Sequence, residues 1–375
     1  MVLDQPFVHT PAAVPIVDLF AGPGGLDVAA EWLGLPATGV EWDPHACATR
    51  AEAGLRTVRG DVRDYGPADF PQATVLAGGP PCQTFTVAGT GVGRRALDRV
   101  LELVALMAKG EDVARLLDSM DDVRTGLVLE PLRWALAAME REHPFEIVVL
   151  EQVPAVLPVW EAMATALEDV GYRTDTGILR TEQFGVPQTR RRAVLIARLG
   201  GQPHLPEPTH RPYRSGVPRE VGDPGLLPWE TMGRTLDRPL PFSVISNYGT
   251  GGDPRARGRR SSDEPSATVT GKIRRNRVIG RGAVDGDRFT PSEAGMLQTF
   301  PRDYPWSGND VGQQIGNAIP PRLGAHVLAA ALGLDLDPAV LDACVRSSWT
   351  DAALPLLGRR SSDLDLGRLQ AEPAS

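Results

Sequence analysis

Cysteine is scarce in this chain: its 375 residues include only Cys47, Cys82 and Cys344. An odd and sparse set excludes a disulfide framework and favours a reducing compartment, so we expect a cytoplasmic protein. Apolar runs stay short of the roughly 18 residues that a membrane span needs. The first ten residues also lack the basic and apolar regions of an export signal. We therefore expect neither export nor insertion into a membrane.

Metal-ligand spacing is absent as well. His204 and His210 lie in a proline-rich stretch without a cysteine partner, so we expect no metal site. The net charge of −8 argues against a polyanionic partner for the chain as a whole. Locally, residues 251–288 hold ten Lys or Arg against five Asp or Glu, and residues 178–220 hold eight against three. Such patches can attract phosphates, although charge alone equally fits an ordinary solvated surface.

Short apolar runs alternate with helical patterns along the first half of the chain. The runs that predict β-strands are residues 14–20, 37–41, 74–78, 146–151 and 193–197. Helical patterns cover residues 26–33, 98–123 and 315–332. This alternation predicts an α/β fold with a doubly wound, mostly parallel sheet. In such a sheet the polar ends of the strands line the site.

Composition divides the chain into four parts. Residues 1–198 predict a catalytic and cofactor-binding domain. Gly and Pro then become frequent and strands become short, so residues 199–290 predict a smaller, irregular β-rich domain. An apolar helical pattern comes back in residues 291–355, which we call the return segment and expect to complete the first domain. Residues 356–375 are a loose, charged C-terminal tail.

The first strand leads into a glycine-rich loop, Asp18 to Gly25. The loop lacks the G-x-G-x-x-G spacing of a dinucleotide fingerprint, and Pro23 removes one N–H that a phosphate would use. A cofactor without phosphates, such as S-adenosylmethionine, suits it. Glu41 ends the second strand and is a candidate acceptor for both ribose hydroxyls. Trp42 is a candidate for facing the adenine, and Asp61 for accepting from its amino group.

A second loop, Gly78 to Gln83, presents Cys82 after two glycines and two prolines. A thiol at a rigid strand exit is a candidate nucleophile, although its pKa of about 8.5 requires activation. Glu151 ends an apolar strand, where a carboxylate is either paired or functional, and it is a candidate for holding a proton on a ring nitrogen. Arg190 and Arg192 share one side of an extended segment. We expect one to orient Glu151 and the other to contact a substrate carbonyl.

Taken in order, these segments resemble the bacterial type of DNA (cytosine-5)-methyltransferase. The resemblance also rests on Glu151-Gln152-Val153, Gln188 to Arg192, Pro265 to Val269 and Gln314 to Pro320. It implies methyl transfer from S-adenosylmethionine to C5 of a flipped-out cytosine in a specific sequence of double-stranded DNA, through a Cys82–C6 adduct. Residues 199–290 would then be the target-recognition domain.

The resemblance also assigns the site residues. Glu151 would stabilise a proton at N3, Arg192 would contact O2, and the Pro80 carbonyl would take the exocyclic amine. The catalytic set is Cys82, Glu151, Arg190 and Arg192. The cofactor-binding set is Phe20, Ala21, Gly22, Gly24, Gly25, Glu41, Trp42, Asp61, Val62, Pro81, Asn317 and Ala318. The family is further associated with a restriction endonuclease that acts on the same site, and we expect a monomer.

One residue departs from the family pattern: Gln152 stands where Asn is usual. If that side chain braces the Cys82 loop, Gln must do so from one methylene further out. Three alternatives stay open from the sequence. They are a cytosine-5 methyltransferase that acts on tRNA, an inactive DNA-binding relative, and a nucleotide-dependent oxidoreductase with a Rossmann-like fold.

Overall fold

The computed structural model describes residues 15–81, 91–118, 123–246, 257–280 and 287–350. Its centre is a seven-stranded sheet in the order β3-β2-β1-β4-β5-β7-β6. The strands are β1 Ile16–Leu19, β2 Ala37–Glu41, β3 Thr57–Arg59, β4 Val75–Gly78, β5 Ile147–Gln152, β6 Arg173–Arg180 and β7 Arg191–Arg198. The pairings among β1 to β5 are parallel, and β7 runs antiparallel to both β5 and β6. The expected mostly parallel sheet is confirmed.

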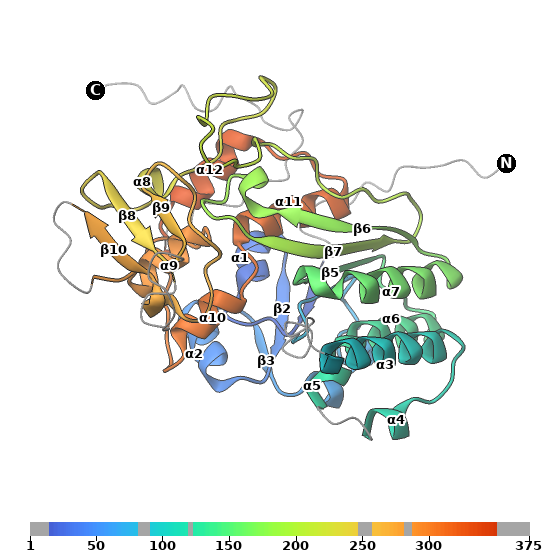
Figure 1. Ribbon diagram of the computed structural model, residues 1–375. Helices are drawn as coiled ribbons and strands as arrows, with labels where there is room; N and C mark the ends of the chain where they lie inside the picture. Colours follow the sequence, from blue (N-terminus) through green and yellow to red (C-terminus); the bar gives the residue numbers. More distant parts are fainter. Residues whose placement is uncertain (1–14, 82–90, 119–122, 247–256, 281–286, 351–375) are drawn as a thin grey trace, which may run out of the picture.

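Helices cover both faces of this sheet (Figure 1). On one face lie α3 Gly91–Ala108, α6 Glu130–Glu140 and α7 Leu157–Asp169, with the short α4 Ala114–Asp118 and α5 Val123–Gly126 beyond them. On the other lie α1 Gly25–Trp32, α11 Pro321–Leu332 and α12 Pro338–Arg346. Helix α2, Pro44–Glu52, connects β2 to β3.

Side-chain alternation along the central strands builds a core on each face. Val148 and Leu150 of β5 pack with the α3, α6 and α7 side, whereas Ile147 and Val149 pack with the α1 and α11 side. A strand with both faces covered must be apolar throughout. This explains why the central strands were recognisable as unbroken apolar runs.

A second, three-stranded antiparallel sheet has the order β10-β8-β9. Its elements are α8 Met232–Thr235, β8 Phe242–Ile245, β9 Arg259–Ser261 and β10 Arg277–Gly280. It is followed by α9 Pro291–Leu297 and α10 Val311–Asn317, which lie beside it (Figure 1). The expected small β-rich region is therefore present.

The core of the small sheet extends past residue 290. Phe242, Val244 and Val278 of the sheet form one buried cluster with Leu297 of α9 and Ile315 of α10. The boundary between residues 290 and 291 stays a prediction, but a continuous core crosses it. The small sheet and the return segment thus pack as one unit.

Membrane-spanning helices and metal-binding clusters are both absent from the described ranges. None of the helices found there is long and apolar enough to cross a membrane. In the same ranges, no group of three or more His, Cys, Asp or Glu side chains is placed to hold a metal ion.

Candidate active site

The carboxyl ends of the parallel strands bring the expected site residues to one edge. β1 ends before the glycine loop, β2 ends at Glu41, β4 ends at Gly78 and β5 ends at Gln152. The register pairs Leu19 with both Val40 and Gly78, so the three strand ends lie next to one another. The rule for open α/β sheets therefore holds here: the site lies beyond the carboxyl ends of the strands.

The glycine loop begins with a sharp backbone reversal. Phe20 has φ 61° and Gly22 has φ 56°, both in the left-handed region. Ala21 between them is buried. A Cβ built on Gly22 meets no atom within 4 Å, so this residue borders open space. Gly22 is the glycine of the loop that leaves room for a ligand.

The next two glycines serve packing instead. A Cβ on Gly24 would lie 2.3 Å from Leu55 Cδ1, and a Cβ on Gly25 would lie 2.3 Å from the carbonyl oxygen of Ile319. The hydroxyl of Tyr304 also donates to the Pro23 carbonyl. Leu55 and two residues of the return segment, Tyr304 and Ile319, thus pack against the loop. Gly24 and Gly25 remain candidates for cofactor contact only through their backbones.

Glu41 is held in place by backbone donors. Its Oε2 accepts from the N–H of Gly22 at 2.7 Å, and its Oε1 accepts from those of Trp42 and Asp43 at 2.9 and 2.7 Å. Burial raises the pKa of Glu41, while these N–H donors act in the opposite direction. A carboxylate has about four acceptor positions, so roughly one is left for a ligand. This geometry suits one ribose hydroxyl better than the expected two.

Trp42 and Asp61, the two residues expected at the adenine, differ in whether their side chains already have a partner. The Trp42 side chain is 71% exposed, which leaves its ring face open for stacking. The Asp61 carboxylate already pairs with Arg63, with Oδ2 at 2.6 Å from Nη2. The hydrogen bond from Arg63 lowers the pKa of Asp61. Val62, the next residue, is buried, and its carbonyl accepts from Arg133 and Trp134.

Asn317 and Ala318 end α10, directly before the Ile319 carbonyl that rests on Gly25. The Asn317 side chain accepts from Gln313 at 2.7 Å and is exposed. Ala318 is buried. The chain therefore reaches the glycine loop directly after these two residues, and their part in a cofactor pocket stays a prediction.

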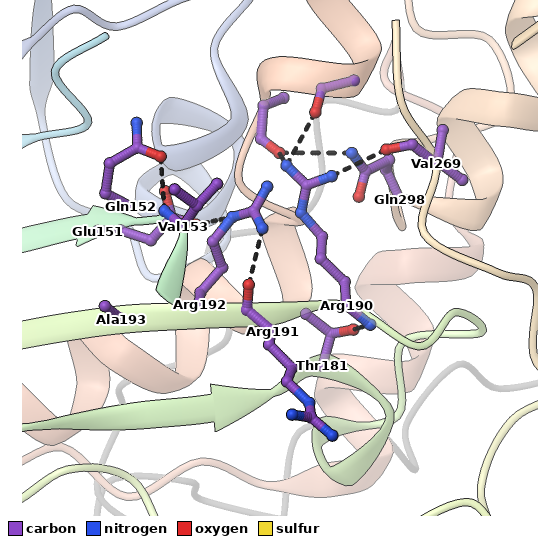
Figure 2. Close-up of polar contacts among 12 residues, drawn as sticks. Glu151, Gln152, Val153, Thr181, Arg190, Arg191, Arg192, Ala193, Val269 and Gln298 are labelled. Atoms are coloured by element: carbon purple, nitrogen blue, oxygen red, sulfur yellow. Dashed lines mark hydrogen bonds and ion pairs between the residues drawn. The ribbon is translucent and has the colours of Figure 1, made fainter. Parts of the chain in front are cut away.

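The carboxylate expected to be catalytic, that of Glu151, is buried beside an arginine. Glu151 Oε1 lies 2.5 Å from Nε of Arg192, and both side chains are about nine-tenths buried (Figure 2). Burial raises the pKa of Glu151, and the Arg192 cation opposes that rise. A Cβ on Gly79 would lie 3.9 Å from the other oxygen, Oε2. One oxygen is thus fixed by the cation while the other faces the loop that carries Cys82.

Arg190 does not lie against Glu151, contrary to one reading of the motif. Its Nη1 donates to the Val269 carbonyl at 2.9 Å, and its Nη2 donates to those of Gly316 and Ala318 at 2.8 and 3.2 Å. Figure 2 shows the Arg190 guanidinium turned towards Val269 while that of Arg192 lies between Glu151 and the Arg191 carbonyl. Arg192 is the residue that orients Glu151, because the guanidinium of Arg190 is engaged by carbonyls elsewhere.

Gln152 reaches the catalytic loop despite its extra methylene. Its Oε1 accepts from the Val153 N–H at 2.6 Å, which directs its Nε2 to the Pro80 carbonyl, also at 2.6 Å. One of the two acceptor positions of that carbonyl is therefore already used. Pro81, next in the chain, is half-buried. Cys82 itself lies outside the described residues, so its position is not part of this geometry.

A buried ion pair under the glycine loop was missed by the sequence reasoning. Arg50 is fully buried and bonds both oxygens of Asp27, at 2.7 and 2.8 Å. Asp18, at the start of the loop, is also buried, and burial together with the nearby Asp27 raises its pKa well above the usual range. No local spacing pairs residues 27 and 50, so the sequence carried no signal for this contact.

The fold and the site together define a class. The sheet has the strand order 3-2-1-4-5-7-6, and β7 runs antiparallel to its neighbours. At its carboxyl edge lies a glycine loop without the spacing of a phosphate-binding fingerprint. This is the architecture of an S-adenosylmethionine-dependent methyltransferase. The family model described as "C-5 cytosine-specific DNA methylase" matches residues 14–103 and 118–221. The chain belongs to this family and is a DNA (cytosine-5)-methyltransferase. The family and fold imply S-adenosylmethionine as donor and DNA as substrate, and they exclude the oxidoreductase alternative.

Similar proteins agree with this assignment. Type II methyltransferase M1.HphI of Haemophilus parahaemolyticus is 29% identical over 364 residues, which cover 85% of this chain and 87% of the relative. Type II methyltransferase M.NgoFVII of Neisseria gonorrhoeae is 26% identical, covering 82% and 83%. Among solved structures, the S. pombe Dnmt2 methyltransferase superposes with a TM-score of 0.57 at 16% identity, covering 85% of this chain and 98% of that one. This last likeness bears on the fold alone.

Proposed function

We propose that this protein methylates C5 of a flipped-out cytosine in a specific sequence of double-stranded DNA, through a temporary bond from Cys82 to C6 of the base. The observation that carries the proposal is the Glu151–Arg192 pair, buried at the end of β5 with one carboxylate oxygen facing Gly79 of the Cys82 loop. A carboxylate so placed suits an acid-base role on a ring nitrogen near a nucleophile.

Cytosine C5 is a poor nucleophile until the ring is activated. The Cys82 thiolate adds to C6, and the electron pair of the C5–C6 bond moves towards C5. Glu151 holds a proton at N3, so the adduct avoids a full negative charge. The raised pKa of Glu151 favours the protonated form that this role requires. After methylation, loss of the C5 proton and expulsion of Cys82 restore the aromatic ring.

Arg192 and Gln152 prepare the same corner. The Arg192 cation fixes one oxygen of Glu151, and its remaining donors are candidates for the O2 carbonyl of the base. Gln152 holds the Pro80 carbonyl two residues before the sulfur. The second acceptor position of that carbonyl is the candidate for the exocyclic amine.

The residues at the carboxyl edge fit the cofactor. Gly22 borders open space, Trp42 offers an open ring face, and Glu41 keeps an acceptor beside both. These residues, with the backbones of Phe20 and Asn317, would hold S-adenosylmethionine. When bound, that cofactor supplies the electrophilic methyl group. The role of each side chain is then to set its orientation towards the base.

DNA binding falls to exposed cations near the small sheet. Lys272, Arg274 and Arg275 form an exposed basic turn before β10, and Arg259 is exposed on β9. Such side chains suit phosphate contacts, which position the protein without reading the sequence. Arg190 is buried and drops out of that role. A base inside a duplex cannot reach Cys82, so flipping at a cost of a few kcal/mol is part of the proposal.

The substrate class is tested by offering duplex DNA and tRNA separately, with a tritiated methyl donor. We expect label in DNA; label in tRNA alone would favour the tRNA alternative. We further expect the protein to act as a monomer beside a restriction endonuclease of the same specificity. Bisulfite sequencing of DNA from expressing cells would then give the site sequence.

The covalent step is tested with S-adenosylmethionine and a duplex that carries 5-fluorocytosine at the mapped site. The wild type should be trapped, because fluorine at C5 cannot leave as a proton does. Cys82→Ser should form no trapped complex and show no turnover, while it binds S-adenosylhomocysteine within a few-fold of the wild type. Cys344→Ala is the matched control, since Cys344 is a buried residue of α12. Trapping by the Cys82→Ser protein would refute the role of the sulfur.

A further inference from the structure

Three side chains of one extended segment point the same way and hold three different parts of the protein. Burial alternates along the segment: Gln188, Arg190 and Arg192 are buried, while Arg191 is exposed and Thr189 is intermediate. Gln188 accepts from the Val269 N–H at 3.0 Å and donates to the Leu297 carbonyl at 3.0 Å. Arg192 pairs with Glu151. Arg190 lies between these two contacts.

Arg190 joins two segments that are distant in sequence. Its guanidinium holds the Val269 carbonyl on one side and those of Gly316 and Ala318 on the other. Within the described ranges it forms no ion pair, although it is only 2% exposed. A buried guanidinium costs free energy for each donor that lacks an acceptor. The Nε of Arg190 has no hydrogen-bond partner among the described residues, so the carbonyls at Nη1 and Nη2 are the acceptors that satisfy the cation there. Separating Val269 from the end of α10 would remove acceptors from a cation that already lacks one.

Backbone contact reinforces this junction. A Cβ on Gly316 would lie 2.1 Å from the Gly271 nitrogen, and a Cβ on Gly312 would lie 2.8 Å from the Gly271 carbonyl oxygen. The two segments thus touch main chain to main chain, as only glycine permits. Thr270 and Gly271 connect Val269 to the basic turn that begins at Lys272.

The other end of the junction leads to the cofactor loop. Ala318 accepts from Arg190, and the next carbonyl, that of Ile319, rests on Gly25. A continuous set of contacts therefore runs from the exposed basic turn through Val269 and Arg190 to the glycine loop. The chain itself links Val269 to the basic turn and Ala318 to Ile319, and hydrogen bonds from Arg190 join these two segments.

We propose that Arg190 is a positioning residue that couples cofactor binding to DNA binding. The inference rests on the proposed function, because it takes the basic turn as a DNA contact. Either ligand orders the junction from its own side, so the second ligand meets a partly ordered partner and binds more tightly. By linkage, each ligand must strengthen the other by the same factor, on the order of tenfold.

The test measures that factor directly in the full chain. S-adenosylhomocysteine, which permits no turnover, is titrated by calorimetry with and without a duplex that contains the mapped site. We expect the duplex to tighten binding about tenfold in the wild type. In Arg190→Lys the factor should fall towards one, because a single ammonium cannot hold carbonyls on two sides as the planar guanidinium does. Affinity for S-adenosylhomocysteine alone should change only a few-fold.

Arg322→Lys is the matched control. Arg322 is another buried arginine, on α11, where it donates to the Phe184 carbonyl at 2.8 Å and pairs with Asp342 at 2.5 Å. It belongs to neither side of the junction, so its substitution should keep the wild-type factor. A loss in both variants would assign the effect to general destabilisation and overturn the special role of Arg190.

A second variant reaches the junction without touching Arg190. Gly316→Ala wedges a methyl group against Gly271 and should also lower the factor. If the duplex does not tighten S-adenosylhomocysteine binding in the wild type, the inference is overturned without any variant. It is also overturned if a folded Arg190→Lys protein shows the same tightening as the wild type. Failure of the proposed function is distinct: the wild type would then label no duplex DNA at all.

Discussion

Two buried arginines hold the two halves of the site in different ways. Arg50, under the cofactor loop, grips the Asp27 carboxylate, which lies 23 residues away in the chain. Arg190, at the junction with the small sheet, grips carbonyls that lie 79, 126 and 128 residues away. The cofactor edge is thus fixed by a local charge pair, and the junction by distant backbone. Arg50 also donates to Thr57 Oγ1 and to the Arg56 carbonyl, so these partners all lie within 23 residues of it. The carbonyls that Arg190 holds lie at least 79 residues away.

The largest effect should come from breaking the local pair. Arg50→Met leaves the Asp27 carboxylate buried without its cation and close to Asp18. Breaking a buried pair on one side typically costs about 3–5 kcal/mol of the free energy of unfolding. Urea unfolding measures this loss. The double variant Arg50→Met with Asp27→Leu should recover part of it, and a double variant as unstable as the single one would contradict the charge argument.

The glycine loop offers a smaller, graded comparison. Gly25→Ala places a methyl group against the Ile319 carbonyl and should cost about 1–3 kcal/mol of stability through forced repacking. Gly22→Ala meets no atom within 4 Å, so only the left-handed backbone opposes it, at about 1 kcal/mol. Thermal unfolding of the two proteins ranks them. Greater damage from Gly22→Ala than from Gly25→Ala would reverse the assignment of packing and ligand-facing glycines.

The Gln152 brace should matter to the rate rather than to the fold. Gln152→Asn shortens the side chain by one methylene, so it cannot bond the Val153 N–H and the Pro80 carbonyl together. Loss of one such hydrogen bond is worth about 1 kcal/mol, which corresponds to a roughly fivefold lower rate of methyl transfer. Gln152→Met, which keeps the length but no donor, should lose as much. Single-turnover kinetics would reveal whether Asn instead restores full activity, which would contradict this role.

The smallest expected effect is a displaced pH profile. In the proposed mechanism methyl transfer needs protonated Glu151, so the rate should fall as pH rises through the pKa of that group, which burial already raises. The Arg192 cation opposes this rise, so Arg192→Gln should raise the pKa of Glu151 further. The alkaline limb of the single-turnover rate should then move to higher pH. An alkaline limb that stays at the same pH or moves to lower pH would show that Arg192 does not lower the pKa of Glu151.

The central sheet was predictable because its strands are buried on both faces. β1, β2, β4, β5 and β7 were all found as apolar runs, and their ends located Glu41 and Glu151. β3 and β6 were missed, since they lie at the two edges and carry several exposed or half-exposed side chains. The single helix expected over residues 98–123 is divided, with Gly110 at φ 73° ending its first part.

Side-chain alternation placed Arg190 and Arg192 on one side, as the structure has them. It could not tell which of the two meets Glu151. That distinction depends on the hydrogen bonds from Arg190 to the carbonyls of Val269 and Gly316, which are tertiary contacts with residues much later in the chain. The same alternation includes Gln188, so its burial was predictable from the motif, although its partners were not.

The continuous core beneath the small sheet restricts how this sheet can be exchanged between relatives. Phe242 and Val278 share buried contacts with Leu297 and Ile315 across residue 290. A chimera that takes only the small sheet from a relative would place new side chains against α9 and α10, whose side chains pack against the original sheet. Recombination between relatives should therefore succeed more often when the transferred fragment extends through α10, because both packing partners of the core are then transferred together.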